Sequence, residues 1–318
     1  MSEHGPILVT GGSGFAGSHL LEHLITAGGS GLHATRFGTK EPLSPLVEAA
    51  VQFHSIDLTD QNAVVTLIQQ LRPTAVYHLA AFSFVGQSFQ KGSSVLFNNI
   101  QLQINLLEAI KEFSPETRIL VIGSAEEYGL SEPEEIPIQE SHPLRPVNPY
   151  AVSKIAQDLL AYSYAVSYDL DIVRVRPFNH IGERQTSDFA VPAFAEQIVA
   201  IERGSLRELR VGDLSGVRDF TAVEDMAAAY SIVMQHGKKG EVYNIGSGRG
   251  VSMQEIVDLL ISYAQVPIKV VVDPTRFRPL DIPTIIANNE RIRSLGWEPT
   301  ISLETSLQKV LNYWRNRV

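Results

Sequence analysis

The 318-residue sequence has no cysteine, and that absence excludes several kinds of chemistry. Disulfide bonds, thiolate metal sites and cysteine nucleophiles all need the missing thiol. A chain without cysteine fits a reducing compartment, so we expect a cytoplasmic protein. No apolar run reaches the ~20 residues that cross a membrane, and MSEHGPILVTGG lacks the pattern of a signal peptide. His19 and His23 have the spacing of a chelating pair, but no third ligand accompanies them, so we expect no metal.

Positive charge is scarce as well. Lys and Arg number 26 against 35 Asp and Glu, which gives a formal charge of −9. Nucleic acids and anionic membranes attract basic surfaces, so we expect neither as a partner. A small anionic ligand is compatible with this balance, because a few local Arg side chains can bind it. With 44% hydrophobic and 19% charged residues, the composition predicts a globular protein with a full core.

The first half of the chain alternates between predicted strands and predicted helices. Each strand is a short apolar run, and each helix has apolar residues at helical spacing. Such alternation predicts an α/β fold built on a Rossmann-type, doubly wound parallel sheet. The predicted strands cover residues 7–10, 32–37, 51–56, 75–79, 118–122 and 171–176, and the predicted helices cover residues 15–27, 62–71, 95–113 and 149–168.

The pattern is looser after residue 176, where Pro and Gly interrupt it. We expect a larger domain of residues 1–176 plus about 221–246, and a smaller, mostly C-terminal lobe of residues 177–220 and 247–318. In this half, helices are predicted at 190–203, 223–235, 253–264 and 303–315, and strands at 209–211, 242–245 and 268–272.

Two predicted helices, residues 95–113 and 149–168, are apolar on nearly all sides. A helix that packs on a sheet needs only one apolar face, so the surplus indicates a second buried face. We interpret this face as a subunit contact and expect a homodimer formed through these two helices. Burial under the C-terminal lobe is the alternative explanation.

A glycine-rich turn joins the first predicted strand to the first predicted helix. Gly11 permits a tight turn, Gly14 lets the backbone approach a pyrophosphate, and Gly17 lets the helix pack close to the sheet. The free N–H groups of the first helical turn, which includes Phe15 and Ala16, would then face the phosphates. This pattern predicts that the larger domain binds a dinucleotide.

The end of the second predicted strand bears on which dinucleotide is bound. An NAD site places an acidic residue about 20 positions after the glycines, where it holds the ribose 2′-hydroxyl. No acid stands there, and Arg36, with Lys40 nearby, could instead pair with a 2′-phosphate. NADP(H) is therefore favoured. NAD(H) is the alternative, in which Arg36 is simply a solvated charge at a strand end.

Further cofactor contacts are expected where the third and fourth predicted strands end. Asp57 and Leu58 follow the third strand, at the edge where an adenine would lie. Leu79, Ala80 and Ala81 follow the fourth strand, and their small side chains leave room for the nicotinamide ribose. Ordinary packing would explain the same small residues.

Tyr150 and Lys154 lie four residues apart, on one face of a predicted helix capped by Asn148. A nearby ammonium favours the phenolate, so we expect Lys154 to lower the pKa of Tyr150. Such a phenol can exchange a proton with a carbonyl oxygen while hydride moves at the carbon, and Lys154 can also reach a cofactor ribose. Ser124 follows the fifth strand and could bond the same oxygen. Glu126 is a candidate acid or base close by.

Taken together, these features resemble the extended short-chain dehydrogenase/reductase family, in the branch that acts on nucleotide-sugars. The resemblance covers nearly the whole chain, and within the branch it is closest to GDP-4-keto-6-deoxy-D-mannose reductases. It rests most on Leu144-Arg-Pro-Val-Asn-Pro-Tyr-Ala-Val-Ser-Lys154, Arg176-Pro-Phe-Asn-His-Ile-Gly182, Val217-Arg-Asp-Phe220 and Arg278-Pro-Leu-Asp-Ile-Pro283.

The resemblance implies a role for individual residues. Ser124, Tyr150 and Lys154 would form the catalytic triad. The guanidinium groups of Arg218 and Arg278 would hold the diphosphate of a GDP-linked sugar. The other residues implied to bind the substrate are Ser83, Phe84, Asn179 and Asp281.

The activity implied by the resemblance is the NADPH-dependent reduction of a 4-keto group on a GDP-6-deoxyhexose. GDP-mannose 4,6-dehydratase activity is the alternative, because Glu126 stands where those dehydratases place an additional acid or base. Nucleotide-sugar 4-epimerase activity is a third hypothesis. A silent NADP-binding regulator is the fourth, although such proteins typically lose the Tyr or the Lys, and this chain keeps both.

Overall fold

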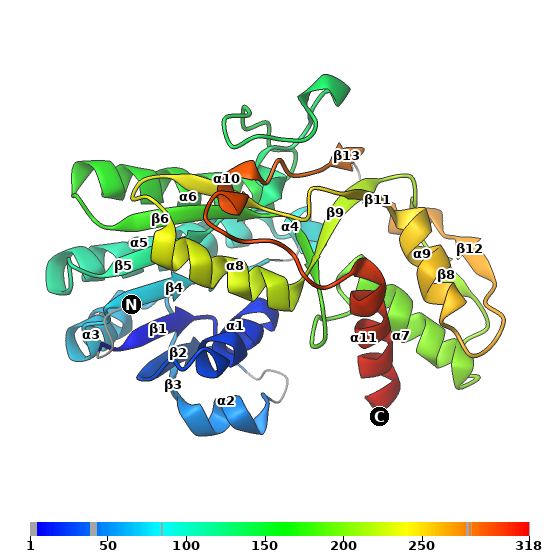
Figure 1. Ribbon diagram of the computed structural model, residues 1–318, viewed down its shortest axis with the longest axis horizontal. Helices are drawn as coiled ribbons and strands as arrows, with labels where there is room; N and C mark the ends of the chain where they lie inside the picture. Colours follow the sequence, from blue (N-terminus) through cyan, green and yellow to red (C-terminus); the bar gives the residue numbers. More distant parts are fainter. Residues whose placement is uncertain (1–4, 39–42, 84, 278–279, 281, 318) are drawn as a thin grey trace.

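The computed structural model describes residues 5–38, 43–83, 85–277, 280 and 282–317 (Figure 1). Within these residues the largest sheet has seven strands in the order β10-β6-β5-β4-β1-β2-β3, and every pairing in it is parallel. This confirms the predicted α/β fold with a Rossmann-type parallel sheet. The strands are β1 (Ile7–Thr10), β2 (Leu32–Arg36), β3 (Val51–Ser55), β4 (Ala75–His78), β5 (Arg118–Ile122), β6 (Ile172–Pro177) and β10 (Val242–Ile245).

Helices cover both faces of this sheet, because its strands are apolar on both sides. One apolar layer joins the sheet to α1 (Phe15–Thr26), α2 (Pro45–Ala50) and α8 (Val223–His236) (Figure 1). The other joins it to α3 (Gln61–Leu71), α5 (Gly92–Phe113) and α6 (Pro149–Ser167). A short helix, α4 (Val85–Ser88), precedes α5.

A separate apolar cluster lies beside the large sheet, on the right in Figure 1, and is built mainly from the later part of the chain. Its helices are α7 (Ala190–Glu202), α9 (Met253–Ser262) and α11 (Leu303–Asn316). Two small sheets accompany it. One contains β7 (Asn179–Ile181), β9 (Val217–Ala222), β11 (Gly250–Ser252) and β13 (Thr284–Ile285), and the other contains β8 (Leu209–Val211) and β12 (Val270–Val272). The domain bounds expected from the sequence stay a prediction.

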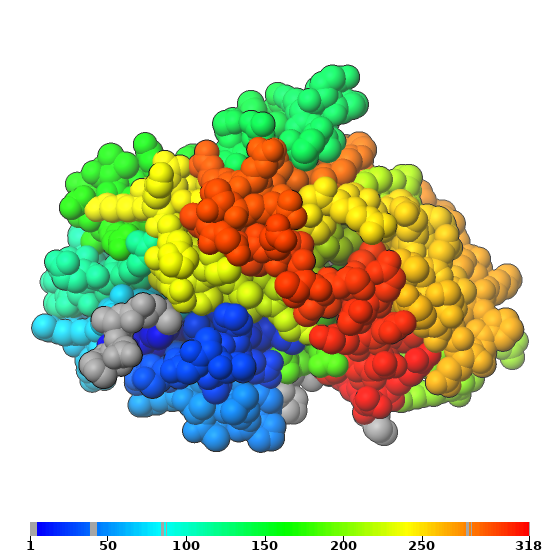
Figure 2. Space-filling model, viewed as in Figure 1, coloured from blue at the N-terminus to red at the C-terminus, as the bar shows by residue number. Residues whose placement is uncertain are grey.

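The C-terminal segment ties this cluster back to the large sheet. Figure 2 shows its orange and red residues lying against both the yellow and the gold parts of the chain. It contains α10 (Glu290–Arg293), which packs beside β10. The buried Trp297 then donates from Nε1 to the carbonyl oxygen of Asp225 on α8, at 3.0 Å. Neither this segment nor any other described helix is long and apolar enough to span a membrane.

Candidate active site

The carboxyl ends of β1, β2, β4 and β5 all meet one edge of the large sheet, since the strands are parallel. The strand order reverses at β1, with β2 on one side and β4 on the other. Ligands of such sheets bind outside the carboxyl ends at this reversal. The glycine turn, Arg36, residues 79–81 and Ser124 lie at the ends of these strands or directly after them, so the fold gathers these predicted site residues at one edge.

The turn after β1 has the tight geometry expected from its glycines. Gly11 has φ +69°, and a Cβ there would lie 3.0 Å from the backbone of Ala80. A Cβ at Gly17 would overlap the carbonyl oxygen of Gly11. The missing side chain of Gly17 therefore lets α1 pack closely against the turn that directly follows β1.

The first turn of α1 fits a bound pyrophosphate. Gly14 precedes the helix and supplies no side chain to cap it, and no acidic residue stands in the first turn. The N–H groups of Phe15 and Ala16 are therefore not capped by a neighbouring side chain, and the positive end of the helix dipole adds to their attraction for an anion.

Side chains beneath this turn were missed by the sequence analysis. The Thr10 hydroxyl lies 2.9 Å from Nδ1 of the buried His78 and accepts from the Ala80 N–H at 3.1 Å. The Gly11 N–H donates to Thr35 Oγ1 at 3.0 Å. These bonds fix the turn between the ends of β2 and β4, and no motif in the sequence indicated them.

Arg36 is the last residue of β2, close to the position expected from the sequence. Its guanidinium lies 4.8 Å from the centre of the Phe53 ring and 3.9 Å from Glu48, and its side chain is 42% exposed. At that exposure the ion pair with Glu48 is weak, so a stronger anion could compete for the guanidinium. Lys40 lies outside the described residues.

The other predicted cofactor contacts follow β3 and β4. The Asp57 carboxylate accepts from the N–H and the hydroxyl of Thr59, at 2.8 and 2.7 Å, and so forms the turn after β3. Leu58 is buried in the apolar layer with α3 and α5. Ala80 and Ala81 are half-buried beside the glycine turn.

The structure brings Ser124, Tyr150 and Lys154 together, and all three are buried. Ser124 begins the turn after β5, and its hydroxyl lies near enough to the Tyr150 phenol to lower the pKa of that phenol. Lys154 lies one turn further along α6 and donates from Nζ to the carbonyl oxygen of Ile122 at 2.8 Å. The predicted cap of α6 is present, because the Asn148 side chain accepts from the Ala151 N–H at 2.8 Å.

The ionisation of this group differs from the sequence-based expectation. Burial raises the pKa of Tyr150 above its ordinary value, and Glu126 and Glu127 raise it further, whereas the Ser124 hydrogen bond lowers it. Lys154 was expected to lower this pKa. That expectation was wrong for the free protein, since the ammonium bonds a β5 carbonyl and burial lowers its own pKa to about 8. The phenol is therefore protonated at neutral pH.

Glu126 lies beside the same group. Its Oε2 accepts from Nδ2 of Asn148 at 2.9 Å, and its side chain is half-buried. The carboxylate is close enough to raise the pKa of Tyr150. An acidic group is thus available at the site, at the position identified from the sequence.

Asn99 of α5 supports the site and was not selected from the sequence. Its side chain is fully buried, donates to Ser153 Oγ at 3.0 Å and to the Phe82 carbonyl at 3.1 Å, and accepts from the Phe82 N–H at 2.8 Å. It therefore joins α5, α6 and the segment after β4. The sequence of α5 also contains Asn98 and Asn105, and nothing in it distinguishes Asn99 from them.

The structure describes three of the six residues expected to bind the substrate. Ser83 is exposed after β4, and Asn179 is exposed on β7. Arg218 is buried on β9 and donates from Nη1 to the carbonyl oxygen of Val217 at 2.9 Å. Phe84, Arg278 and Asp281 lie outside the described residues.

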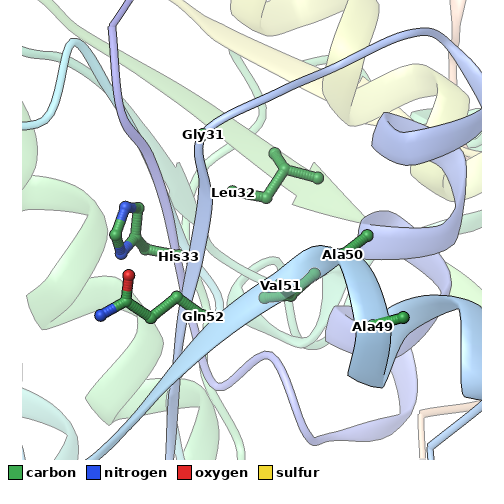
Figure 3. Close-up of a pocket in the computed structure, with 7 residues that line it drawn as sticks. All are labelled: Gly31, Leu32, His33, Ala49, Ala50, Val51 and Gln52. Atoms are coloured by element: carbon green, nitrogen blue, oxygen red, sulfur yellow. The ribbon is translucent and has the colours of Figure 1, made fainter.

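A surface pocket lies at the opposite end of the sheet and does not belong to this site. It surrounds the beginnings of β2 and β3, with His33 and Gln52 side by side in Figure 3. The sheet separates it from the ends of β1, β4 and β5, where the proposed reactive groups lie. Its lining residues are Gly31, Leu32, His33, Ala49, Ala50, Val51 and Gln52.

Comparison with known proteins agrees with the geometry. A family model described as GDP-mannose 4,6 dehydratase matches residues 8–310. The chain is 34% identical to GDP-6-deoxy-D-mannose reductase of Pseudomonas aeruginosa over 98% of each protein, and 29% identical to UDP-glucose 4-epimerase of Lacticaseibacillus casei over 98% of this chain and 97% of the relative.

Solved structures show the same similarity. The structure of RMD from Pseudomonas aeruginosa complexed with NADPH superposes with a TM-score of 0.85 at 31% identity, covering 99% of this chain and all of that one. Thermus thermophilus UDP-glucose 4-epimerase in complex with NAD gives a TM-score of 0.87 at 27% identity, covering 98% of this chain and all of that one.

The geometry of the glycine turn predicts the effect of Gly17→Ala. The added methyl group overlaps the Gly11 carbonyl and displaces the turn, so we expect dinucleotide affinity to fall by about tenfold or more, or at least 1.4 kcal/mol. Binding can be measured by titration calorimetry. Gly28→Ala is the control for backbone strain: its φ of +81° disfavours alanine, but a Cβ there meets nothing within 4 Å and the residue follows the far end of α1, so it should bind like the wild type. Equal affinity in all three proteins would contradict the prediction.

Proposed function

Because this chain belongs to the GDP-mannose 4,6-dehydratase family of extended short-chain dehydrogenases/reductases, we propose that it is a nucleotide-sugar reductase. The proposed reaction is the NADPH-dependent reduction of the C4 keto group of GDP-4-dehydro-6-deoxy-D-mannose to a GDP-6-deoxyhexose, GDP-D-rhamnose. The observation that carries the proposal is the burial of Tyr150 beside Ser124 and Lys154 at the carboxyl edge of the parallel sheet, where burial raises the pKa of the phenol.

The chemistry of this group suits a reduction. Reducing a ketone places negative charge on its oxygen, which must then receive a proton. The Tyr150 phenol is protonated and can supply it, while the Ser124 hydroxyl donates a hydrogen bond to the same oxygen and orients it. Lys154 keeps its positive charge up to about pH 8 and would hold a hydroxyl of the cofactor ribose. When bound, the nicotinamide supplies the hydride.

NADP(H) is the cofactor we propose, with NAD(H) as the alternative. The first turn of α1 would hold the pyrophosphate, and Arg36 would pair with the 2′-phosphate, which NAD lacks. The reductase-type neighbour is a complex with NADPH, whereas epimerase neighbours are complexes with NAD. Asp57, Leu58, Leu79, Ala80 and Ala81 are proposed to border the rest of the cofactor.

The substrate is proposed to lie between this edge and the small sheet of β7 and β9. Asn179 on β7 and Arg218 on β9 would contact the nucleotide and its diphosphate, together with Arg278. Guanidinium groups match phosphate oxygens in charge and shape. Ser83 is exposed after β4 and would border the sugar.

Glu126 supports a second candidate function, GDP-mannose 4,6-dehydratase activity. Dehydration needs an acid or base that removes the C5 proton in addition to the Tyr, and Glu126 lies near Tyr150. A 4-epimerase is also represented among the relatives. A silent regulator is disfavoured, because Tyr150 and Lys154 are both present and placed together.

We also propose that two copies of the chain pair through α5 and α6. The two helices pack on each other, yet their outer sides expose large apolar groups. Phe97 is 75% exposed, Val166 is 64% exposed and Leu159 is 50% exposed. A second copy would remove this apolar surface from water. The cytoplasmic location stays a prediction.

The substrate assignment is tested by supplying either GDP-mannose alone or the 4-keto-6-deoxy intermediate with NADPH. We expect NADPH oxidation only with the keto-sugar, and a fall of about 100-fold or more in Tyr150→Phe, which lacks the proton donor. Tyr168→Phe, at an exposed tyrosine, is the control. Conversion of GDP-mannose without added reductant would instead establish the dehydratase.

Cofactor preference is tested with Arg36→Ala. Loss of a guanidinium paired with a 2′-phosphate should weaken NADPH binding about tenfold and leave NADH binding unchanged. Arg293→Ala removes an arginine of similar exposure on α10 and should affect neither. Equal weakening of NADPH and NADH by Arg36→Ala would rule out the proposed pairing.

The dimer is tested with Val166→Glu, which places a charge on the exposed face of α6. We expect sedimentation velocity to show a dimer for the wild type and a monomer for the variant, because burying an unpaired charge is costly. Val272→Glu changes a similarly exposed valine on β12 and should stay dimeric. A wild-type monomer at micromolar concentration would refute the pairing.

A further inference from the structure

A carboxylate that the proposed reaction does not use is buried directly beneath the site. Glu127 is 0% exposed, and its two oxygens accept from Ser124 N–H at 2.7 Å and from Arg176 Nε at 2.9 Å. We propose that Glu127 is a positioning residue that acts through the Tyr150–Lys154 pair: its carboxylate holds the turn that carries Ser124 against Arg176 of β6, beside the end of β5 that binds Lys154. The inference rests on the catalytic roles proposed for that pair.

Glu127 holds the turn that carries Ser124. Ser124 and Glu127 form a capping box around the short turn that follows β5. The capping box of Ser252 and Glu255 at the start of α9 places its glutamate at the surface, so such a turn does not require a buried carboxylate. Glu127 instead reaches Arg176 on β6. It therefore joins the turn that carries the serine to the neighbouring strand.

Burial of this carboxylate is compensated by a network of charges. Arg176 also donates to Asp158 at 2.7 Å, and Arg174 donates to the same Asp158 oxygen at 2.9 Å. The groups that act on Glu127 are Asp158, Arg176 and Lys154, together with the Ser124 N–H. A buried ion network of this kind is costly to assemble and is weak evidence for stability alone, which favours a role at the site.

Glu127 also belongs to the charged groups that surround Tyr150 and Lys154. Lys154 is acted on by Glu127, which raises its pKa, and it lowers the pKa of His78 on β4. Tyr150 is faced by Ser124 and by Glu126 and Glu127, both of which raise its pKa, and by Tyr230 of α8. Among the described residues, Glu127 is thus the one group that favours the protonated form of both Tyr150 and Lys154.

The direction in which Glu127 shifts the protonation of Lys154 and Tyr150 depends on the pH at which Glu127 itself ionises. Burial and Asp158 raise the pKa of its carboxyl to about 8, so it is negatively charged on the alkaline side. That is where Lys154, whose pKa is also about 8, would lose its proton. Glu127 therefore extends the pH range in which the ammonium and the phenol are protonated, and a neutral replacement should shorten it.

The direct experiment is an NMR titration of the Lys154 side chain in protein labelled with ¹³C at lysine Cε. The Lys154 signal is assigned as the one missing from Lys154→Arg. We expect Glu127→Gln to move its titration midpoint to lower pH by about one pH unit, the smallest effect typical of a neighbouring opposite charge. A midpoint equal to that of the wild type would overturn the proposal.

Two variants serve as matched controls. Glu127→Asp keeps the charge but shortens the reach to Ser124, so it should keep the wild-type midpoint. Asp158→Asn removes a carboxylate from the same network without acting on Lys154, so it should not lower the midpoint either. If Glu127→Gln does not fold, Glu127→Asp and Asp158→Asn still test the proposal. A lowered Lys154 midpoint in either variant would contradict the claim that the charge of Glu127 keeps Lys154 protonated.

Reductase rates separate this inference from the proposed function. For reduction of the 4-keto-sugar by NADPH, the alkaline limb of kcat should move to lower pH by about one pH unit in Glu127→Gln and stay in place in Glu127→Asp. The plateau should fall about tenfold in both, because Ser124 is less well held. If the Lys154 midpoint moves but the protein does not reduce the 4-keto-sugar, only the proposed substrate is refuted. If the protein reduces the 4-keto-sugar but the alkaline limb of kcat does not move in Glu127→Gln, only the role of Glu127 is refuted.

Discussion

The ammonium of Lys154 is a buried positive charge, and the arrangement of the site follows from how the fold accommodates it. A charge at 4% exposure needs a partner, and it finds one in the Ile122 carbonyl at the end of β5, with Glu127 adding a negative charge on the alkaline side. These partners fix Lys154 against the sheet rather than against the phenol. Tyr150 is therefore left protonated beside Ser124, in the state that a reductase requires of its acid.

The parallel sheet explains why the remaining parts meet at the same place. The strands on either side of the reversal have their carboxyl ends at one edge, and each ends in or precedes a short segment proposed to bind or react: the glycine turn, Arg36, the segment after β4, and Ser124. Thr35 and Thr10 accept hydrogen bonds from the Gly11 and Ala80 N–H groups, and Asn99 bonds the Phe82 main chain, so the first three segments are held in place. The cofactor and the reacting carbonyl are thus expected side by side.

Periodic and local signals in the sequence were enough to predict the parallel sheet and to select Ser124, Tyr150 and Lys154 as candidate site residues. The predicted strands and helices of the large sheet lie within a few residues of their predicted bounds, because each is an apolar run of clear period, whereas the short helix α2 was not predicted. Strands β7, β9, β11 and β13 were not predicted either, since they contain polar residues and are stabilised by pairing with distant segments. Likewise, the direction of the Tyr150 pKa depends on burial and on where Lys154 bonds, which no spacing reveals.

The central claim is that the Tyr150 phenol, held by Ser124 and charged partners, lies next to the reacting carbon of a nucleotide-sugar when the dinucleotide is bound. A crystal structure with NADPH and GDP tests it most directly. We predict the pyrophosphate at the first turn of α1 and the nicotinamide beside the Tyr150 hydroxyl. A nicotinamide bound away from that hydroxyl, or a dinucleotide at another edge of the sheet, would contradict the account.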